Sequence, residues 1–284
     1  MRAIAEDDPV PGVKDVVLVM SGKGGVGKST VAANLALAFS RGGKRVGLLD
    51  ADMYGPSVPT LFGIAGRPLG SGTKIVPLAR FGVKLMSIGF LLDDDKSAVV
   101  WRGPMLHGAL LQFLKDVEWG ELDVLVLDLP PGTGDIALTL AQRVRASGAV
   151  IVTTPQEVAL QDVYKSVSMA RKVGIPILGV VENESYFLCD GCSKRHDIFG
   201  RGGGEKIAAF AEAPLLAQIP LETAVREWGD AGTPIVEASP GSSSAQAFVA
   251  LAAAVMERLG AVDGGEAVAI DRSGGANRHL PIAR

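Results

Sequence analysis

Short runs of apolar, largely β-branched residues alternate along this chain with longer stretches rich in alanine and leucine. Most of the short runs are continuously apolar, which is typical of strands buried on both faces of a sheet. The strand candidates are residues 15–20, 45–50, 83–90, 123–129, 149–154, 177–182 and 215–219. The helix candidates between them are residues 28–40, 105–117, 135–146, 160–173, 205–213 and 245–259.

This alternation predicts an α/β fold, with a single-domain, doubly wound, mostly parallel sheet flanked by helices. Such sheets bind ligands at the carboxyl ends of their strands. The chain has 284 residues, and we place one domain at residues 13–260. Residues 1–12 and 261–284 show no sustained period, so we expect flexible ends. Ser242, Ser243 and Ser244 stand where the N-cap of the last helix should be.

Composition narrows the class of protein. Hydrophobic residues make up 48% and charged residues 21%, as in ordinary soluble domains. The net charge of -3 gives no support for nucleic-acid binding, which usually needs a basic surface. The acidic N-terminus lacks the apolar segment of a signal peptide, and no apolar run is long enough for a membrane span. We therefore expect a cytoplasmic protein with no nucleic-acid and no membrane partner.

A glycine-rich motif lies between the first predicted strand and helix. Residues 22–30 (GKGGVGKST) match the phosphate-binding loop pattern G-x-x-x-x-G-K-[ST]. Glycines let backbone N–H groups turn toward a polyphosphate, and the helix points its positive end at the same anion. A glycine-rich turn can match by chance, but strand, loop, lysine, hydroxyl and helix all agree here. The candidate nucleotide-binding residues are Gly22, Lys23, Gly24, Gly25, Val26, Gly27, Lys28, Ser29 and Thr30.

Within this loop, three side chains carry the chemistry. Lys28 is expected to reach the β- and γ-phosphates, and Ser29 to offer its hydroxyl to Mg²⁺. Lys23 is a second cation, either an exposed lysine without a role or a group that meets a γ-phosphate in its own or a neighbouring subunit. Lys23 and Lys28 are therefore candidate catalytic residues.

Two other predicted strands end in carboxylates. Residues 124–128 form an apolar strand that ends at Asp128, the Walker B pattern, in which the acid holds Mg²⁺. Asp50 and Asp52 follow another strand; we expect Asp52 to orient or deprotonate the attacking water and Asp50 to help the metal. Solvated turn acids are the alternative. No glutamine suited to positioning water is evident, so we predict slow hydrolysis.

Two further segments follow strand ends. The Pro/Gly segment after Asp128 lies where a nucleotide-sensing switch would meet the γ-phosphate, and it can also be a rigid turn ending in a helix cap. Asn183 could read a base edge through its amide or simply form a turn. The switch candidates are Pro131, Gly132, Thr133, Gly134 and Asp135.

The chain has two cysteines, Cys189 and Cys192, spaced as C-x-x-C. In a reducing compartment this pattern favours metal binding over a disulfide or inert thiols, and it does not open a helix as a thioredoxin-like pair would. Two thiolates cannot complete a tetrahedral zinc site or hold a four-ligand cluster. Cysteine arithmetic therefore favours a homodimer with one shared centre. His196 could add a nitrogen ligand, but a surface histidine is the simpler interpretation.

Together these motifs resemble a known family. The loop with its extra Lys23 resembles the deviant Walker A motif of the MinD/Mrp class of dimerising ATPases. Within that class, five segments resemble the Mrp/ApbC family of iron–sulfur carrier ATPases, and the likeness spans roughly residues 13–259. The five are DADMYGPS (50–57), WRGPM (101–105), DLPPGTGD (128–135), VENESYFLCDGC (181–192) and IFG (198–200).

The resemblance implies a P-loop NTPase that forms a homodimer and binds and slowly hydrolyses ATP with Mg²⁺. It also implies a labile [4Fe–4S] cluster, bridged by Cys189 and Cys192 of both subunits and passed to apo iron–sulfur proteins. By the same resemblance, Lys23 contacts nucleotide across the dimer. The residues implied around the base are Pro155, Gln156, Asn183 and Pro220.

The chain departs from this family at three points. About a dozen residues precede the first strand, where many bacterial relatives have an extra domain, and the N-terminal four-cysteine cluster of some eukaryotic relatives is missing from the sequence. Glu184 stands where an apolar residue is usual. Two alternatives stay open: a MinD/ParA-type positioning ATPase that binds membrane or DNA, and a dimer joined by structural zinc.

Overall fold

An eight-stranded sheet forms the centre of the computed structural model, which describes residues 8–53, 55–91, 103–134, 143–189, 191–192 and 194–264. The strand order is β12-β9-β8-β1-β7-β2-β6-β5, and every neighbouring pair is parallel except β5 and β6. This arrangement confirms the predicted fold class. The strands are β1 (Val13–Ser21), β2 (Val46–Asp50), β5 (Leu78–Arg80), β6 (Val83–Ser87), β7 (Leu122–Asp128), β8 (Gly148–Thr153), β9 (Ile177–Glu182) and β12 (Leu215–Gln218).

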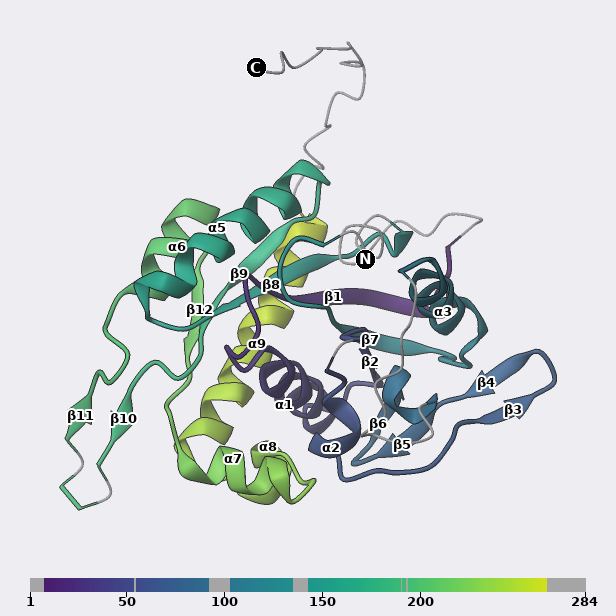
Figure 1. Ribbon diagram of the computed structural model, residues 1–284, viewed down its shortest axis with the longest axis horizontal. Helices are drawn as coiled ribbons and strands as arrows, with labels where there is room; N and C mark the ends of the chain where they lie inside the picture. The colour runs from purple at the N-terminus through teal and green to yellow at the C-terminus, as the bar shows by residue number, and fades with distance from the viewer. Residues whose placement is uncertain are drawn as a thin grey trace, which may run out of the picture.

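Helices cover both faces of the sheet (Figure 1). One layer contains α1 (Lys28–Arg41), α2 (Val58–Leu61), α7 (Thr223–Asp230), α8 (Ile235–Ala238) and α9 (Ser243–Gly264). The other contains α3 (Gly103–Asp116), α5 (Glu157–Lys172) and α6 (Gly203–Ala211). An apolar cluster lies between each layer and the sheet, one around Phe39 and Phe248 and the other around Phe113 and Leu160. Burial on both faces explains why the strands read as continuous apolar runs.

The chain reverses its direction of winding at β1. Elements from β2 to β7 lie on one side of β1, and the strands from β8 onward lie on the other. Ligands in doubly wound sheets bind outside the carboxyl ends of the strands at such a point. The glycine-rich loop that follows β1 therefore occupies the position where this fold binds ligands.

Several short helices and strands were not predicted from the sequence. The strand expected over residues 83–90 ends at Ser87, because Ile88–Leu91 forms a 3₁₀ turn. Besides α2, α7, α8 and β5, the missed elements include two hairpins, β3 (Leu69–Ser71) with β4 (Lys74–Val76) and β10 (Phe187–Leu188) with β11 (Arg195–His196). Figure 1 shows the β10–β11 hairpin extending away from the sheet. Elements of two to four residues are too short to show a hydrophobic period.

The ends of the domain differ slightly from the expected limits. Val10, before β1, is buried, and α9 continues to Gly264, beyond the expected end at residue 260. The Ser242 hydroxyl oxygen accepts a hydrogen bond from the Ala245 amide at 3.1 Å, which confirms a serine cap on α9. Residues 1–7, residues 265–284 and most of the helix predicted over 135–146 lie outside the described residues.

One described helix, α9, is long and apolar enough to cross a membrane, judged by its length and composition alone. The stretch Ser243–Val262 of α9 has a mean hydropathy of 1.4 over 20 residues. The same helix packs against α1, α8 and β12. These contacts bury 33% of the apolar stretch, so length and composition alone are weak evidence for a membrane span.

Candidate functional site

The loop between β1 and α1 has the backbone of an anion site. Gly25 and Gly27 have φ angles of +79° and +76°, in the left-handed region that favours glycine. Gly27 is the N-cap of α1, and its cap has no side-chain hydrogen bond. An opening of about 480 Å³ adjoins the loop, lined by Lys23, Lys28, Ser29 and other loop residues. An uncapped helix start at such an opening is suited to a phosphate group.

Gly22 is required by the packing of α5 beneath the loop. A Cβ at Gly22 would lie 2.3 Å from the backbone nitrogen of Val163 and 2.4 Å from the carbonyl carbon of Asp162. The Ser166 hydroxyl donates to the carbonyl oxygen of Ser21 at 3.3 Å. The start of the loop is therefore held directly against a helix that lies far away in sequence.

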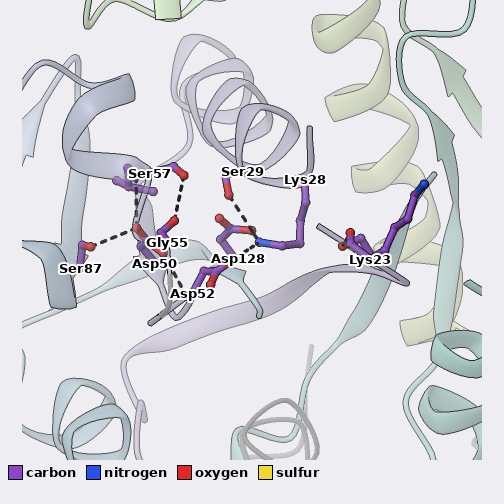
Figure 2. A network of polar contacts seen from close by, with 11 residues as sticks. Lys23, Lys28, Ser29, Asp50, Asp52, Gly55, Ser57, Ser87 and Asp128 are labelled. Atoms are coloured by element: carbon purple, nitrogen blue, oxygen red, sulfur yellow. Dashed lines mark hydrogen bonds and ion pairs between the residues drawn. The ribbon is translucent and has the colours of Figure 1, made fainter. Parts of the chain in front are cut away.

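Lys28 points into a cluster of carboxylates (Figure 2). Its Nζ lies 2.5 Å from Asp128 Oδ1 and 3.6 Å from Asp52 Oδ2. Lys28 and Asp128 are both buried, so they form a desolvated ion pair. Burial raises the pKa of Asp128, and the charge of Lys28 acts in the opposite direction. A bound phosphate would compete with Asp128 for the same ammonium group.

One oxygen of Asp128 lacks a hydrogen-bond partner in the part of the chain that the structure describes. Its Oδ2 atom is buried and makes no hydrogen bond to any described residue. The Ser29 hydroxyl lies nearby, 3.4 Å from Lys28 Nζ. A carboxylate oxygen and a hydroxyl are ligands that Mg²⁺ accepts. The pair therefore fits the magnesium role expected for Ser29 and Asp128.

Asp50, at the end of β2, accepts hydrogen bonds from the loop that follows the strand. It is fully buried; its Oδ1 accepts a hydrogen bond from the Asp52 amide at 3.1 Å, and its Oδ2 accepts from the Val58 amide at 3.1 Å and the Ser87 hydroxyl at 3.0 Å. Asp52 lines the phosphate-side opening, whereas Asp50 is not among its lining residues. Asp50 thus holds the loop after β2, and its help to the metal stays a prediction.

We expect the nucleotide-free protein to lose stability as the pH rises from about 4 to about 7. Burial, followed by the charge of Asp128, raises the pKa of Asp50 from 3.8 to about 7. In this window the folded chain keeps a proton that the unfolded chain has released, so the free energy of unfolding falls by up to about 1.4 kcal/mol per pH unit. Urea unfolding across this range measures the slope. Asp50→Asn should make the slope shallower and leave the part that comes from the raised pKa of Asp128, and an unchanged slope in that variant would contradict the assignment.

The Pro/Gly segment after β7 is tied to the phosphate loop. Pro131 lines the opening, and the Gly132 amide donates to the carbonyl oxygen of Ser21 at 2.9 Å. Thr133 and Gly134 are exposed, and Asp135 lies outside the described residues. The segment is thus positioned beside the phosphate loop, and its action as a switch stays a prediction.

A second opening of about 270 Å³ lies beside the first. It is lined by Gly27, Thr30, Asn183, Glu184, Pro220 and by residues of α7, which the sequence patterns missed. The Asn183 Nδ2 atom donates a hydrogen bond to the Val26 carbonyl at 3.0 Å, which ties this side chain to the phosphate loop. Pro155 and Gln156 are not among the lining residues of either opening. Asn183 and Pro220 therefore lie where a base would adjoin the phosphate loop.

Lys23 takes no part in the Lys28 cluster. Figure 2 shows its side chain pointing away from Lys28 and from the three aspartates. It nevertheless borders the phosphate-side opening. The geometry within one chain therefore leaves the Lys23 ammonium directed outward.

The two cysteines lie in the connection of the β10–β11 hairpin. Cys189 and Cys192 are not joined by a disulfide, and Cys192 is exposed. The Cys189 amide donates to the Lys194 carbonyl at 3.0 Å. His196 is exposed on β11, opposite Phe187. Within the described ranges, no group of three or more His, Cys, Asp or Glu side chains is arranged to hold a metal ion.

Known proteins are similar to this chain over most of its length. A family model described as ParA, NUBPL iron-transfer P-loop NTPase, matches residues 12–256. An iron-sulfur cluster carrier protein of Aquifex aeolicus is 54% identical over 248 residues, 86% of this chain and 67% of the relative. The mouse iron-sulfur cluster transfer protein NUBPL is 45% identical over 261 residues, 91% of this chain and 82% of the relative.

Solved structures show the same fold. A nucleotide-binding protein from Archaeoglobus fulgidus in complex with ADP has a TM-score of 0.69 and 42% identity, covering 78% of this chain and 87% of its own. The cell division ATPase MinD of Pyrococcus furiosus has a TM-score of 0.65 and 26% identity, covering 86% of this chain and 99% of its own.

Proposed function

Because the chain belongs to the ParA family of NUBPL-type iron-transfer P-loop NTPases, we propose that it is an ATP-hydrolysing iron–sulfur cluster carrier. In this proposal two copies bind one [4Fe–4S] cluster as cargo and pass it to apo-proteins, while each copy binds and slowly hydrolyses ATP. The observation that carries it is the presence, in one domain, of a phosphate loop and an extended hairpin with two cysteines.

The nucleotide half of the proposal rests on the Lys28 cluster. Lys28 would leave Asp128 for the β- and γ-phosphates, and Asp52 would orient the attacking water. Mg²⁺, held by Ser29 and the open Oδ2 of Asp128, would offset phosphate charge. Asp52 is the one acid near Lys28 that also lines the opening, which supports its choice as the water-positioning group.

The cluster half of the proposal rests on the hairpin. Each chain offers two thiols, on a segment that Figure 1 shows extending from the body. A [4Fe–4S] cluster takes four thiolate ligands, so two copies must each contribute a pair. Cys192 is exposed and Cys189 is partly buried, which supports a pair that a second copy or an accepting protein could reach.

Replacing both cysteines tests the carrier function directly. We expect anaerobic reconstitution to load about four iron and four sulfide per dimer in the wild type. Cys189→Ser with Cys192→Ser should bind almost none, because the cluster loses all its ligands. His196→Gln, an exposed change in the same hairpin, serves as the control and should load normally. Iron and sulfide assays measure the outcome.

Two results would overturn the proposal. Equal iron loading in the double cysteine variant would place the cluster elsewhere. Stoichiometric zinc in protein purified without oxygen, with no transfer of iron to an apo-protein, would instead support a dimer joined by structural metal.

A further inference from the structure

Glu184 occupies an unusual position beside the second opening. It follows Asn183 directly after β9 and adopts a φ of 51°, in the left-handed region that non-glycine residues rarely enter. Its side chain is half-buried, and it lines the opening together with Gly27 and Thr30. Left-handed backbone at a residue other than glycine is a feature often found at binding sites.

The carboxylate of Glu184 differs from the other acids that line this opening. Glu222 accepts a hydrogen bond from the Ser244 amide at 3.2 Å, and Asp230 pairs with Arg226 at 2.9 Å. Glu184 has no hydrogen bond or ion pair among the described residues, and burial alone raises its pKa. A partly desolvated carboxylate without a donor costs folding free energy unless a ligand supplies one.

Asn183 provides a second acceptor next to it. One N–H of its Nδ2 donates to the Val26 carbonyl, which leaves the Oδ1 acceptor and a second N–H for a ligand. Two neighbouring acceptors are complementary to a group with hydrogens to donate. The exocyclic amino group of a purine is such a donor on the base of a nucleotide whose phosphates lie in the adjoining loop.

We propose that Glu184 is a specificity-determining residue that accepts a hydrogen bond from the exocyclic amino group of a bound purine nucleotide. The inference rests on the proposed nucleotide binding, and it adds which side chain recognises the base. Adenine carries this amino group at position 6 of the ring, and guanine carries it at position 2. Comparing each nucleotide with an analogue that lacks the amino group therefore shows which of the two bases is recognised.

The test measures equilibrium binding of four nucleoside diphosphates by calorimetry. ADP is compared with purine riboside diphosphate, which lacks the 6-amino group, and GDP with IDP, which lacks the 2-amino group. In the wild type we expect at least one amino-bearing nucleotide to bind about tenfold to a hundredfold tighter than its partner, because a hydrogen bond to a charged acceptor is lost. Equal affinities within both pairs would overturn the proposal.

Glu184→Met should reduce the affected ratio to about one, since an apolar side chain of similar length cannot accept the hydrogen bond. Glu212→Met is the matched control: Glu212 is also left-handed, with φ 48°, and is exposed at the end of α6, away from both openings. It should keep the wild-type ratio. An unchanged ratio in Glu184→Met would overturn the assignment.

The two proposals fail in different ways. Tripolyphosphate binding reports the phosphate loop without a base and should be equal in the wild type and Glu184→Met. Wild-type protein that binds none of the four nucleotides would contradict the proposed function itself. Wild-type protein that binds ADP with no dependence on residue 184 would contradict only the role of Glu184.

Discussion

Lys23→Ala should lower the rate of ATP hydrolysis by about 10³-fold or more, while ADP binding changes little. A cation that reaches the transferred phosphate from a neighbouring subunit contributes rate effects of about 10³–10⁵. The Lys23 side chain points away from the Lys28 cluster of its own chain, so its loss leaves that cluster intact (Figure 2). Single-turnover phosphate release measures the rate, and Lys165→Ala, an exposed lysine on α5, is the control.

Mixing two inactive variants tests whether Lys23 acts across a dimer. Lys28→Met should not bind nucleotide productively but still carries Lys23. Added to Lys23→Ala, it should restore hydrolysis, because the mixed dimer joins an intact nucleotide site to an intact Lys23. If the mixture is no faster than Lys23→Ala alone, the cross-subunit role is wrong.

Lys28→Met should also destabilise the folded protein, by about 3 kcal/mol, as expected when a buried ion pair loses one member. Asp128 is buried, and its Oδ2 has no hydrogen-bond partner among the described residues, so losing Lys28 leaves its charge uncompensated. The loss should be smaller at low pH, because burial raises the pKa of Asp128 and protonation removes the charge. Urea unfolding of the nucleotide-free protein measures the effect.

A double-mutant cycle separates stability from function at this pair. Asp128→Asn removes the charge, so the double variant Lys28→Met with Asp128→Asn should recover most of the lost stability. It should not recover ATP hydrolysis, because the phosphate ligand and the metal ligand are both missing. A double variant as unstable as the sum of the two single variants would contradict a buried ion pair here.

The phosphate loop and the main strands could be predicted because their signals are local. Gly22 to Ser29 are consecutive, and each strand buried on both faces is continuously apolar. The different positions of Asp50, bonded to the loop after β2, and Asp52, at the opening, could not be predicted. Asp50 and Asp52 are two residues apart, yet Asp52 lines the opening while Asp50 accepts hydrogen bonds from the amides of Asp52 and Val58 and the hydroxyl of Ser87.

The short helix α7 was missed for a related reason. Only Ala224, Val225 and Trp228 of its eight residues are apolar, so the segment reads as a polar connection in the sequence. In the structure it lines the opening beside Asn183 and Glu184. In the sequence, Glu184 stood out only because the family usually has an apolar residue at this position. The fold shows its left-handed backbone and that no described residue forms a hydrogen bond or ion pair with its side chain.

By itself, the sequence determined the α/β class, the phosphate-binding loop, the acid at the end of β7 and the paired cysteines, since each depends on residues close together in the chain. Only the tertiary structure decided that β7 lies between β1 and β2, which brings Asp128 within 2.5 Å of Lys28 across 100 residues of sequence. The order of strands depends on packing between distant segments, and packing leaves no local pattern in the sequence.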